Sequence, residues 1–185
     1  IYIFVLAIIF VLKKEMRFFL PSISVNLFGI IYISYLLSYT ILLRSVNPYG
    51  REFFLITLIS IWVSDSLAYF IGTKFGKRPL SSLISPKKTV EGAIAEVFGS
   101  LLCFFVFYKI AKFDFLKNTD WVLMGFLCGI MAIFGDLTES LFKRNLGVKD
   151  SGAILPEHGG MLDKVDSLLF VAPTIFWYLK VFVLR

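Results

Sequence analysis

The stretch SLFKRNLGVKDSGAILPEHGGMLDKVDS, residues 140 to 167, decides how this chain is organised, because it is a dense run of charge between two strongly apolar segments. Its ionisable side chains are Lys143, Arg144, Lys149, Asp150, Glu157, His158, Asp163, Lys164 and Asp166. Charge this dense has to face water. Acids beside cations, with Gly159 and Gly160 letting a ligand approach the backbone closely, favour a site for a divalent metal and phosphate. A solvated loop between two membrane helices is the alternative that the charge alone leaves open.

The composition of the whole chain is that of a membrane protein. Of its 185 residues 58% are hydrophobic and 21 are Phe, and the mean hydropathy is +0.82. A soluble domain is only about half apolar. One soluble core could not bury so many aromatic rings, whereas in a bilayer the rings can face the lipid. Cys103 and Cys128 fall inside apolar runs, where small buried hydrophobes are expected rather than a disulfide or metal ligands.

The apolar runs predict an all-α fold, a polytopic integral membrane bundle of about six transmembrane helices. The expected spans are residues 1–12, 22–43, 53–73, 90–111, 121–144 and about 165–184. The first run is too short for a span of about twenty residues, so we expect it to be the incomplete end of a helix that begins upstream. We divide the chain into N-terminal helices, 1–63, and a second membrane domain, 64–185, with polar loops at 74–89 and 144–164.

The net charge of +6 indicates membrane topology rather than nucleic-acid binding. Lys and Arg occur in short clusters between the apolar runs, without a basic face or an aromatic platform, so we expect no nucleic-acid partner and instead contacts with anionic headgroups. The segments after the first, third and fifth helices carry most of the cations. By the positive-inside rule these segments, including both polar loops, are cytosolic.

The fifth expected helix carries a polar stripe. Asp136, Ser140 and Lys143 are spaced i, i+4, i+7, which places them on one face over about 10 Å. A wet cavity within the bundle explains such a stripe, because ionisable groups are costly in lipid. The alternative is that residues 136–144 have left the membrane and that Glu139 and Lys143 form an ordinary surface pair. The helical pattern leaves both open.

Three further acids have two interpretations each. Asp163 and Asp166 are one turn apart, so both can face one ion if the last helix starts near Leu162, but acids are also favoured at a helix N-terminus by the dipole. Asp65 lies well inside the third span, as a ligand-binding group or as a satisfied intramembrane hydrogen bond.

The order of these residues resembles the signature of the phosphatidate cytidylyltransferase (CDP-diacylglycerol synthase) family, S-x-apolar-K-R-x4-K-D-x-small-x2-apolar-P-x-H-G-G-apolar-x-D-R-apolar-D. The matching positions are Ser140, Lys143, Arg144, Lys149, Asp150, Gly152, Pro156, His158, Gly159, Gly160, Asp163 and Asp166. Lys164 stands where the family has Arg, so a planar fork becomes a point charge. A second stretch, 64–92, resembles the family through Asp65, Ala68, Tyr69, Ser85, Pro86, Lys87, Lys88, Thr89, Glu91 and Gly92.

The resemblance implies an Mg²⁺-dependent nucleotidyltransferase that transfers a cytidylyl group from CTP to phosphatidate, giving CDP-diacylglycerol and pyrophosphate for phospholipid biosynthesis. The implied catalytic residues are Asp136, Asp163, Asp166, Lys143, Lys149 and His158, and the three Asp are the implied metal ligands, for Mg²⁺ and optionally a second cation. The implied substrate-binding residues are Asp65, Lys87, Lys88, Glu91, Ser140, Arg144, Asp150, Gly159, Gly160 and Lys164. Lysines at a helix start suit a polyphosphate. For His158, the single histidine, a structural role stays open, and so does a turn-forming role for Asp150.

The expected partners are CTP, phosphatidate and the lipid bilayer, with a homodimer by analogy with the family. The expected location is the bacterial inner (cytoplasmic) membrane, with the active loops facing the cytosol. Two other functions stay open. One is a cation-coupled transporter, which also uses intramembrane acids, although the sequence contains no inverted repeat or broken helix. The other is a related CTP transferase acting on another lipid phosphate, which would share most of these residues.

Overall fold

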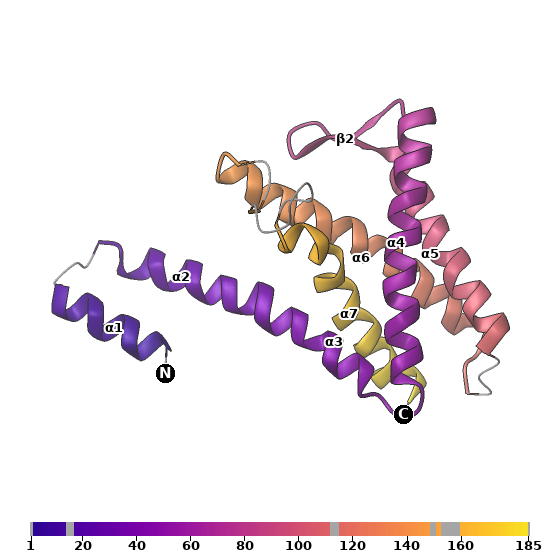
Figure 1. Ribbon diagram of the computed structural model, residues 1–185, viewed down its shortest axis with the longest axis horizontal. Coiled ribbons are helices and arrows are strands. Elements are labelled where there is room, and N and C mark those ends of the chain that lie inside the picture. The colour runs from indigo at the N-terminus through magenta and orange to yellow at the C-terminus, as the bar shows by residue number, and fades with distance from the viewer. Residues whose placement is uncertain (1, 14–16, 112–114, 149–150, 153–159, 185) are drawn as a thin grey trace.

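The computed structural model describes residues 2–13, 17–111, 115–148, 151–152 and 160–184 (Figure 1). Within these residues the elements are α1 (Tyr2–Lys13), α2 (Phe19–Gly29), the π-helical η1 (Ile30–Tyr35), α3 (Leu36–Arg44), α4 (Gly50–Phe75), β1 (Pro79–Ser81), β2 (Ser85–Thr89), α5 (Val90–Ala111), α6 (Asn118–Asn145), the 3₁₀-helical η2 (Leu162–Lys164), α7 (Asp166–Tyr178) and the π-helical η3 (Leu179–Val183). The predicted all-α class is confirmed.

Five helices are long and apolar enough to cross a membrane. They are Phe19–Arg44, Gly50–Phe75, Val90–Ala111, Asn118–Asn145 and Asp166–Val183, and a shorter apolar helix, Ile3–Leu12, precedes them. The 22-residue span Val90–Ala111 extends about 33 Å at 1.5 Å per residue, enough for a hydrocarbon core of about 30 Å. The observed spans match the predicted ones with small extensions at most ends. The first of them is one continuous helix made of α2, η1 and α3.

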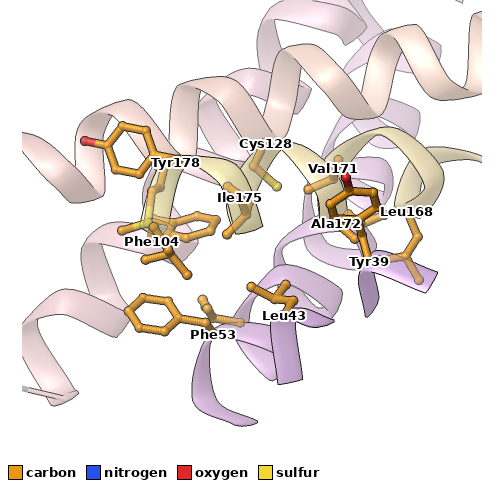
Figure 2. Packing of buried hydrophobic residues seen from close by; sticks show 14 of the residues in the cluster. Tyr39, Leu43, Phe53, Phe104, Cys128, Leu168, Val171, Ala172, Ile175 and Tyr178 are labelled. Atoms are coloured by element: carbon orange, nitrogen blue, oxygen red, sulfur yellow. The ribbon is translucent and has the colours of Figure 1, made fainter. Parts of the chain in front are cut away.

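The four C-terminal spans pack in a chain of neighbours. α5 lies between α4 and α6, and α7 packs against both α6 and α3. Figure 2 shows the apolar core where they meet, which includes Tyr39, Leu43, Phe53, Phe104, Cys128, Val171, Ala172 and Ile175. In contrast, α1 packs along α2 at the edge of the molecule (Figure 1), where the rings of Phe10 and Phe19 lie 5.6 Å apart.

Close helix contact in this bundle depends on small residues, as is common in membranes. A Cβ atom on Gly135 of α6 would lie 2.6 Å from the carbonyl oxygen of Asp166, at the start of α7. Only a glycine allows this approach. It places Asp136, the next residue along α6, beside the N-terminus of α7.

The segment 74–89, which we predicted as a basic loop, contains a short antiparallel hairpin. β1 and β2 pair Pro79 with Thr89 and Ser81 with Ser85. The prediction missed these strands because they are short and lack an alternation of apolar and polar residues. The hairpin corrects a second expectation, since Lys87 and Lys88 lie on β2 and not in the first turn of α5.

Candidate active site

A cavity of about 380 Å³ lies between α4, the hairpin, α5 and α6, within the size range of ligand sites. Its walls are formed by Asp65, Ala68, Tyr69, Gly72 and Thr73 of α4, by Leu80, Lys87, Lys88 and Thr89 of the hairpin, by Gly92, Ala93 and Glu96 of α5, and by Asp136 of α6. The hairpin is fixed to α5 by Thr89, whose hydroxyl oxygen accepts a hydrogen bond of 3.1 Å from the Gly92 N–H and so caps the helix.

An ion pair between Lys88 and Asp136 joins the hairpin to α6 across this cavity, with side chains 25% and 33% exposed. Ser140 Oγ donates a second hydrogen bond to Asp136 Oδ1 at 3.2 Å. Burial alone would lower the pKa of Lys88, but the carboxylates of Asp136, Glu96 and Asp65 outweigh it and hold that pKa above its ordinary value. Lys88 is therefore a charged ammonium group surrounded by acids.

A second ionic cluster lies further along α6. Lys143 Nζ donates hydrogen bonds to Glu139 Oε2 at 2.6 Å and to Asp163 Oδ1 at 2.7 Å. The other oxygen of Asp163 accepts hydrogen bonds from the Ser151 N–H at 3.1 Å, the Ser151 hydroxyl at 2.8 Å and the Gly160 N–H at 2.7 Å. Although burial raises it, the pKa of Asp163 is lowered overall by Lys143 and these donors. The carboxylate of Asp163 is thus ionised and holds residues 151 and 160 against α6.

Asp163 and Asp166 have different surroundings. A shared ion on one helix face required the last helix to start near Leu162, but α7 starts at Asp166, close to the predicted 165, and Asp163 lies in the separate 3₁₀ turn η2. The change of direction occurs at Val165, which has φ −122° and ψ 0°. Asp166 is buried, and its Oδ1 accepts a hydrogen bond of 2.7 Å from the Ser167 N–H. The condition for a shared ion on one regular helix face is therefore not met.

Two other predicted substrate-binding residues join segments of the protein. The Glu91 carboxylate accepts hydrogen bonds from the N–H groups of Lys77 at 3.1 Å and Arg78 at 3.3 Å, which fastens the hairpin to α5. Arg144 Nε donates to the carbonyl oxygen of Ile84 at 3.3 Å. This bond brings the C-terminal end of α6 to the hairpin, so the two segments predicted as loops meet at the same end of the bundle.

The remaining predicted residues fall into three groups. Asp65, Lys87 and Lys88 line the cavity, while Lys164 lies in η2. Lys149, Asp150, His158 and Gly159 lie outside the described residues, so their assignments stay predictions.

Two buried acids were not assigned from the sequence. Glu96 lines the cavity and is 3% exposed, and Glu139 is 1% exposed. One carboxyl oxygen of each has no hydrogen-bond partner among the described residues. The signal for Glu96 was an acid inside an apolar span. Glu139 with Lys143 had been left open as a surface pair, and the burial of Glu139 excludes that alternative.

The site fits a cation by its charge. The ammonium groups of Lys88 and Lys143 are each paired with acids and interact with six carboxyl groups in total. These belong to Asp65, Glu96, Asp136, Glu139, Asp163 and Asp166. Carboxylate oxygens are the ligands that Mg²⁺ prefers. Among the described residues, however, no three His, Cys, Asp or Glu side chains are arranged as ligands of one metal ion. The assignment of Asp136, Asp163 and Asp166 as metal ligands therefore stays a prediction.

Helices long and apolar enough to cross a membrane, with acids and lysines gathered in a cavity at one end, define an integral membrane protein with a polar site. Comparison with known proteins makes this class specific. The chain matches the Cytidylyltransferase family over residues 1–182 and belongs to that family.

Its curated relatives include bacterial proteins named phosphatidate cytidylyltransferase. The protein of Synechocystis sp. is 38% identical over 185 residues, covering 86% of this chain and 62% of the relative. That of Thermotoga maritima is 41% identical over 158 residues, covering 83% and 57%, and that of Bacillus subtilis is 40% identical over 152 residues, covering 82% and 56%. The chain thus spans somewhat more than half the length of these relatives.

Proposed function

We propose that this chain carries the active site of a phosphatidate cytidylyltransferase, which transfers a cytidylyl group from CTP to phosphatidate. The names of the relatives support this proposal. The observation that carries it is the charged Lys88, paired with Asp136, in a cavity that membrane helices and a polar hairpin form together. Such a cavity suits a reaction between a lipid phosphate and a water-soluble nucleotide.

The reaction needs positive charge more than it needs a base. An ionised oxygen of the phosphatidate phosphate attacks the α-phosphorus of CTP and forms the new P–O bond. The bond from the α-phosphorus to the oxygen bridging the α- and β-phosphates breaks, and pyrophosphate leaves with that electron pair. Because the attacking oxygen is already ionised, no general base is required. Two anionic reactants repel each other, so the site has to neutralise them and hold them in line.

The lysines are the groups that do this in our proposal. Lys88 and Lys87, from the cavity wall, bind the phosphates of CTP, while Lys143 and Arg144, at the end of α6, bind the phosphate of the lipid. Point charges on a fixed hairpin and helix need little rearrangement when the phosphates arrive.

An Mg²⁺ ion would be held by Asp136 with Asp163 and Asp166. When bound, it supplies positive charge to the α-phosphate and the leaving oxygens. Ser140 would orient Asp136 through the hydrogen bond already present between them. Lys149, Asp150, His158, Gly159, Gly160 and Lys164 complete the proposed contacts to the substrates.

The cavity end of the bundle faces the cytosol of a bacterium in this proposal, with the diacyl chains remaining in the inner membrane. The clusters of Lys and Arg in the segments that meet there support this orientation. A homodimer is part of the proposal by analogy with the family.

The test is incorporation of labelled CTP into lipid by the full-length protein in vesicles containing phosphatidate, with and without Mg²⁺. We expect labelled CDP-diacylglycerol and an equal amount of pyrophosphate, both dependent on Mg²⁺. Parallel vesicles with an ether-linked or polyprenyl phosphate identify a relative with another substrate. Cation uptake without any nucleotide product would instead indicate a transporter and refute the proposal.

A further inference from the structure

Tyr32 is a buried residue of the N-terminal helices, to which the proposed mechanism gives no role. It lies in the π-helical segment η1 and is 5% exposed, whereas its neighbours Ile31 and Ile33 are exposed. Its hydroxyl group has no hydrogen-bond partner among the described residues. A buried hydroxyl without a partner is unfavourable, so its presence calls for an explanation. π-Helical turns within α-helices are frequent at functional sites.

The aromatic neighbours of Tyr32 place its ring between α6 and α7. The ring stacks on Phe28 at 5.3 Å between centroids and meets the edge of Phe142, also at 5.3 Å. The ring of Phe170 lies 6.3 Å away. Phe142 comes three residues after Glu139 on α6, and Phe170 comes four residues after Asp166 on α7. Tyr32 is therefore packed one helical turn from two buried acids of the site.

The charges around the hydroxyl group agree with this placement. The carboxyl groups of Asp166, Glu139 and Asp136 lie close enough to the Tyr32 hydroxyl to interact with it electrostatically. Glu139 has its own unpartnered oxygen, Oε1, while its Oε2 accepts the Lys143 hydrogen bond. A donor and an acceptor, both buried and both unpaired among the described residues, thus lie in the same interior region between η1, α6 and α7. One ordered water molecule can satisfy such groups at once.

We propose that Tyr32 is a positioning residue of the active site, whose hydroxyl group donates through one buried water to the carboxylates of Glu139 and Asp166. This bond holds both carboxylates in place behind Asp136 and thereby strengthens cation binding. Its link to catalysis rests on the proposed function, but its effect on cation binding does not. The N-terminal helices would then contribute to the chemistry of the site as well as to its packing.

The test compares Tyr32→Phe with Tyr39→Phe in the full-length protein. Tyr32→Phe keeps the three ring contacts and removes the hydroxyl group alone. Tyr39 is the matched control, because it lies on the same continuous helix, is equally buried at 5%, and its hydroxyl is bonded to Tyr35 Oη at 2.9 Å and to Trp177 Nε1 at 3.1 Å. Tyr39→Phe therefore removes hydrogen bonds to Tyr35 and Trp177, and not a contact with Glu139 or Asp166.

The first readout is Mn²⁺ binding, measured by electron paramagnetic resonance without CTP or lipid. Loss of an outer partner of a metal ligand weakens metal binding about 10–100-fold, so we expect Tyr32→Phe to raise the Kd for Mn²⁺ about tenfold and Tyr39→Phe to leave it unchanged. The midpoint of thermal unfolding should fall no more in Tyr32→Phe than in Tyr39→Phe. An unchanged Kd in Tyr32→Phe, an equal change in both variants, or a wild-type protein that binds no Mn²⁺ would overturn the inference.

A double-mutant cycle tests the partner. If Tyr32 acts through Glu139, adding Tyr32→Phe to Glu139→Gln should weaken Mn²⁺ binding less than Tyr32→Phe does alone. Full additivity would contradict that route. Because these readouts contain no nucleotide, a normal Mn²⁺ result with no CDP-lipid product would refute the proposed function and leave the role of Tyr32 standing.

Discussion

Replacement of Lys88 by Gln removes the cation on which our proposed mechanism depends most. The side chain keeps most of its length and a hydrogen-bonding end but loses its charge. Asp136 then loses its ion-pair partner, and Glu96 and Asp65 lose a positive charge that acts on both of them. The change therefore affects both stability and turnover. The size of the stability effect follows from the burial of the pair.

The effect on stability should be moderate. An exposed ion pair contributes about 0–1 kcal/mol, and removing one partner of a fully buried pair costs about 3–5 kcal/mol. With side chains 25% and 33% exposed, this pair falls between the two, and we expect a loss of about 1–2 kcal/mol. Because the pKa of Lys88 is raised above its ordinary 10.5, this contribution is complete at neutral pH and is lost only as the pH rises through that raised pKa.

The effect on turnover should be larger. Removing one fixed donor from a developing charge lowers kcat about 10²–10³-fold in other enzymes, and we expect a loss of that size in CTP incorporation by Lys88→Gln. Lys77→Gln is the matched control, because it removes an exposed cation from the same segment but not from the cavity. A Lys88→Gln protein with wild-type turnover, or a loss of similar size in Lys77→Gln, would refute the assignment of Lys88 to the phosphates.

Four further predictions concern the rest of the site and its support. Asp136→Asn and Asp163→Asn should each abolish metal-dependent CTP incorporation while the protein stays folded by circular dichroism, and wild-type rates in either would contradict the ligand assignment. The pKa of Asp163 is lowered, so its contribution to the stability of the protein is complete above its ordinary pKa of 3.8 and is lost as the pH falls below that value. The unfolding midpoint of Asp163→Asn should therefore depend less on pH below 3.8 than that of the wild type. Gly135→Ala should force α6 away from α7 and lower the free energy of unfolding by about 1–3 kcal/mol, which lowers the unfolding midpoint. The control is Gly29→Ala, whose Cβ meets nothing within 4 Å and which should stabilise the protein by about 0.5–1 kcal/mol. Equal midpoints in the two variants would show that the contact at Gly135 is not tight. Lys164→Arg should leave turnover nearly unchanged if only charge matters at that position, and a large gain would show that the family's bidentate fork is needed.

The membrane spans could be predicted from the sequence because a span has to be apolar over its whole length. The run predicted at 90–111 coincides with α5, and the run predicted at 121–144 lies inside Asn118–Asn145. The hairpin could not be predicted in this way, because its strands are short and polar and form through pairing with each other and through Glu91. A local pattern of hydrophobicity carries no information about that kind of contact.

The residue types of the site could also be predicted, but the partners that lie on other elements could not. The motif placed acids and lysines at one end of the bundle, and the structure adds that Lys88 pairs with Asp136 while Lys143 pairs with Glu139 and Asp163. Lys88 and Asp136 are 48 positions apart, and Lys143 and Asp163 are 20 apart. Helix periodicity describes only neighbours within one helix, such as Glu139 and Lys143. The role of Tyr32 was hidden for the same reason, since its ring contacts lie on α6 and α7.

The contacts that form the candidate site also hold this end of the bundle together. Without a ligand, the acids of α6 need cations close by, since burying an unpaired charge is costly. The hairpin supplies Lys88 to Asp136, and Arg144 returns a hydrogen bond to the hairpin at Ile84. The hairpin therefore cannot leave α6 without depriving the partly buried carboxylate of Asp136 of its cation. A substitution of Lys88 or Arg144 should consequently lower both stability and turnover. A loss of activity therefore identifies a role in phosphate binding only where it exceeds the loss expected from unfolding.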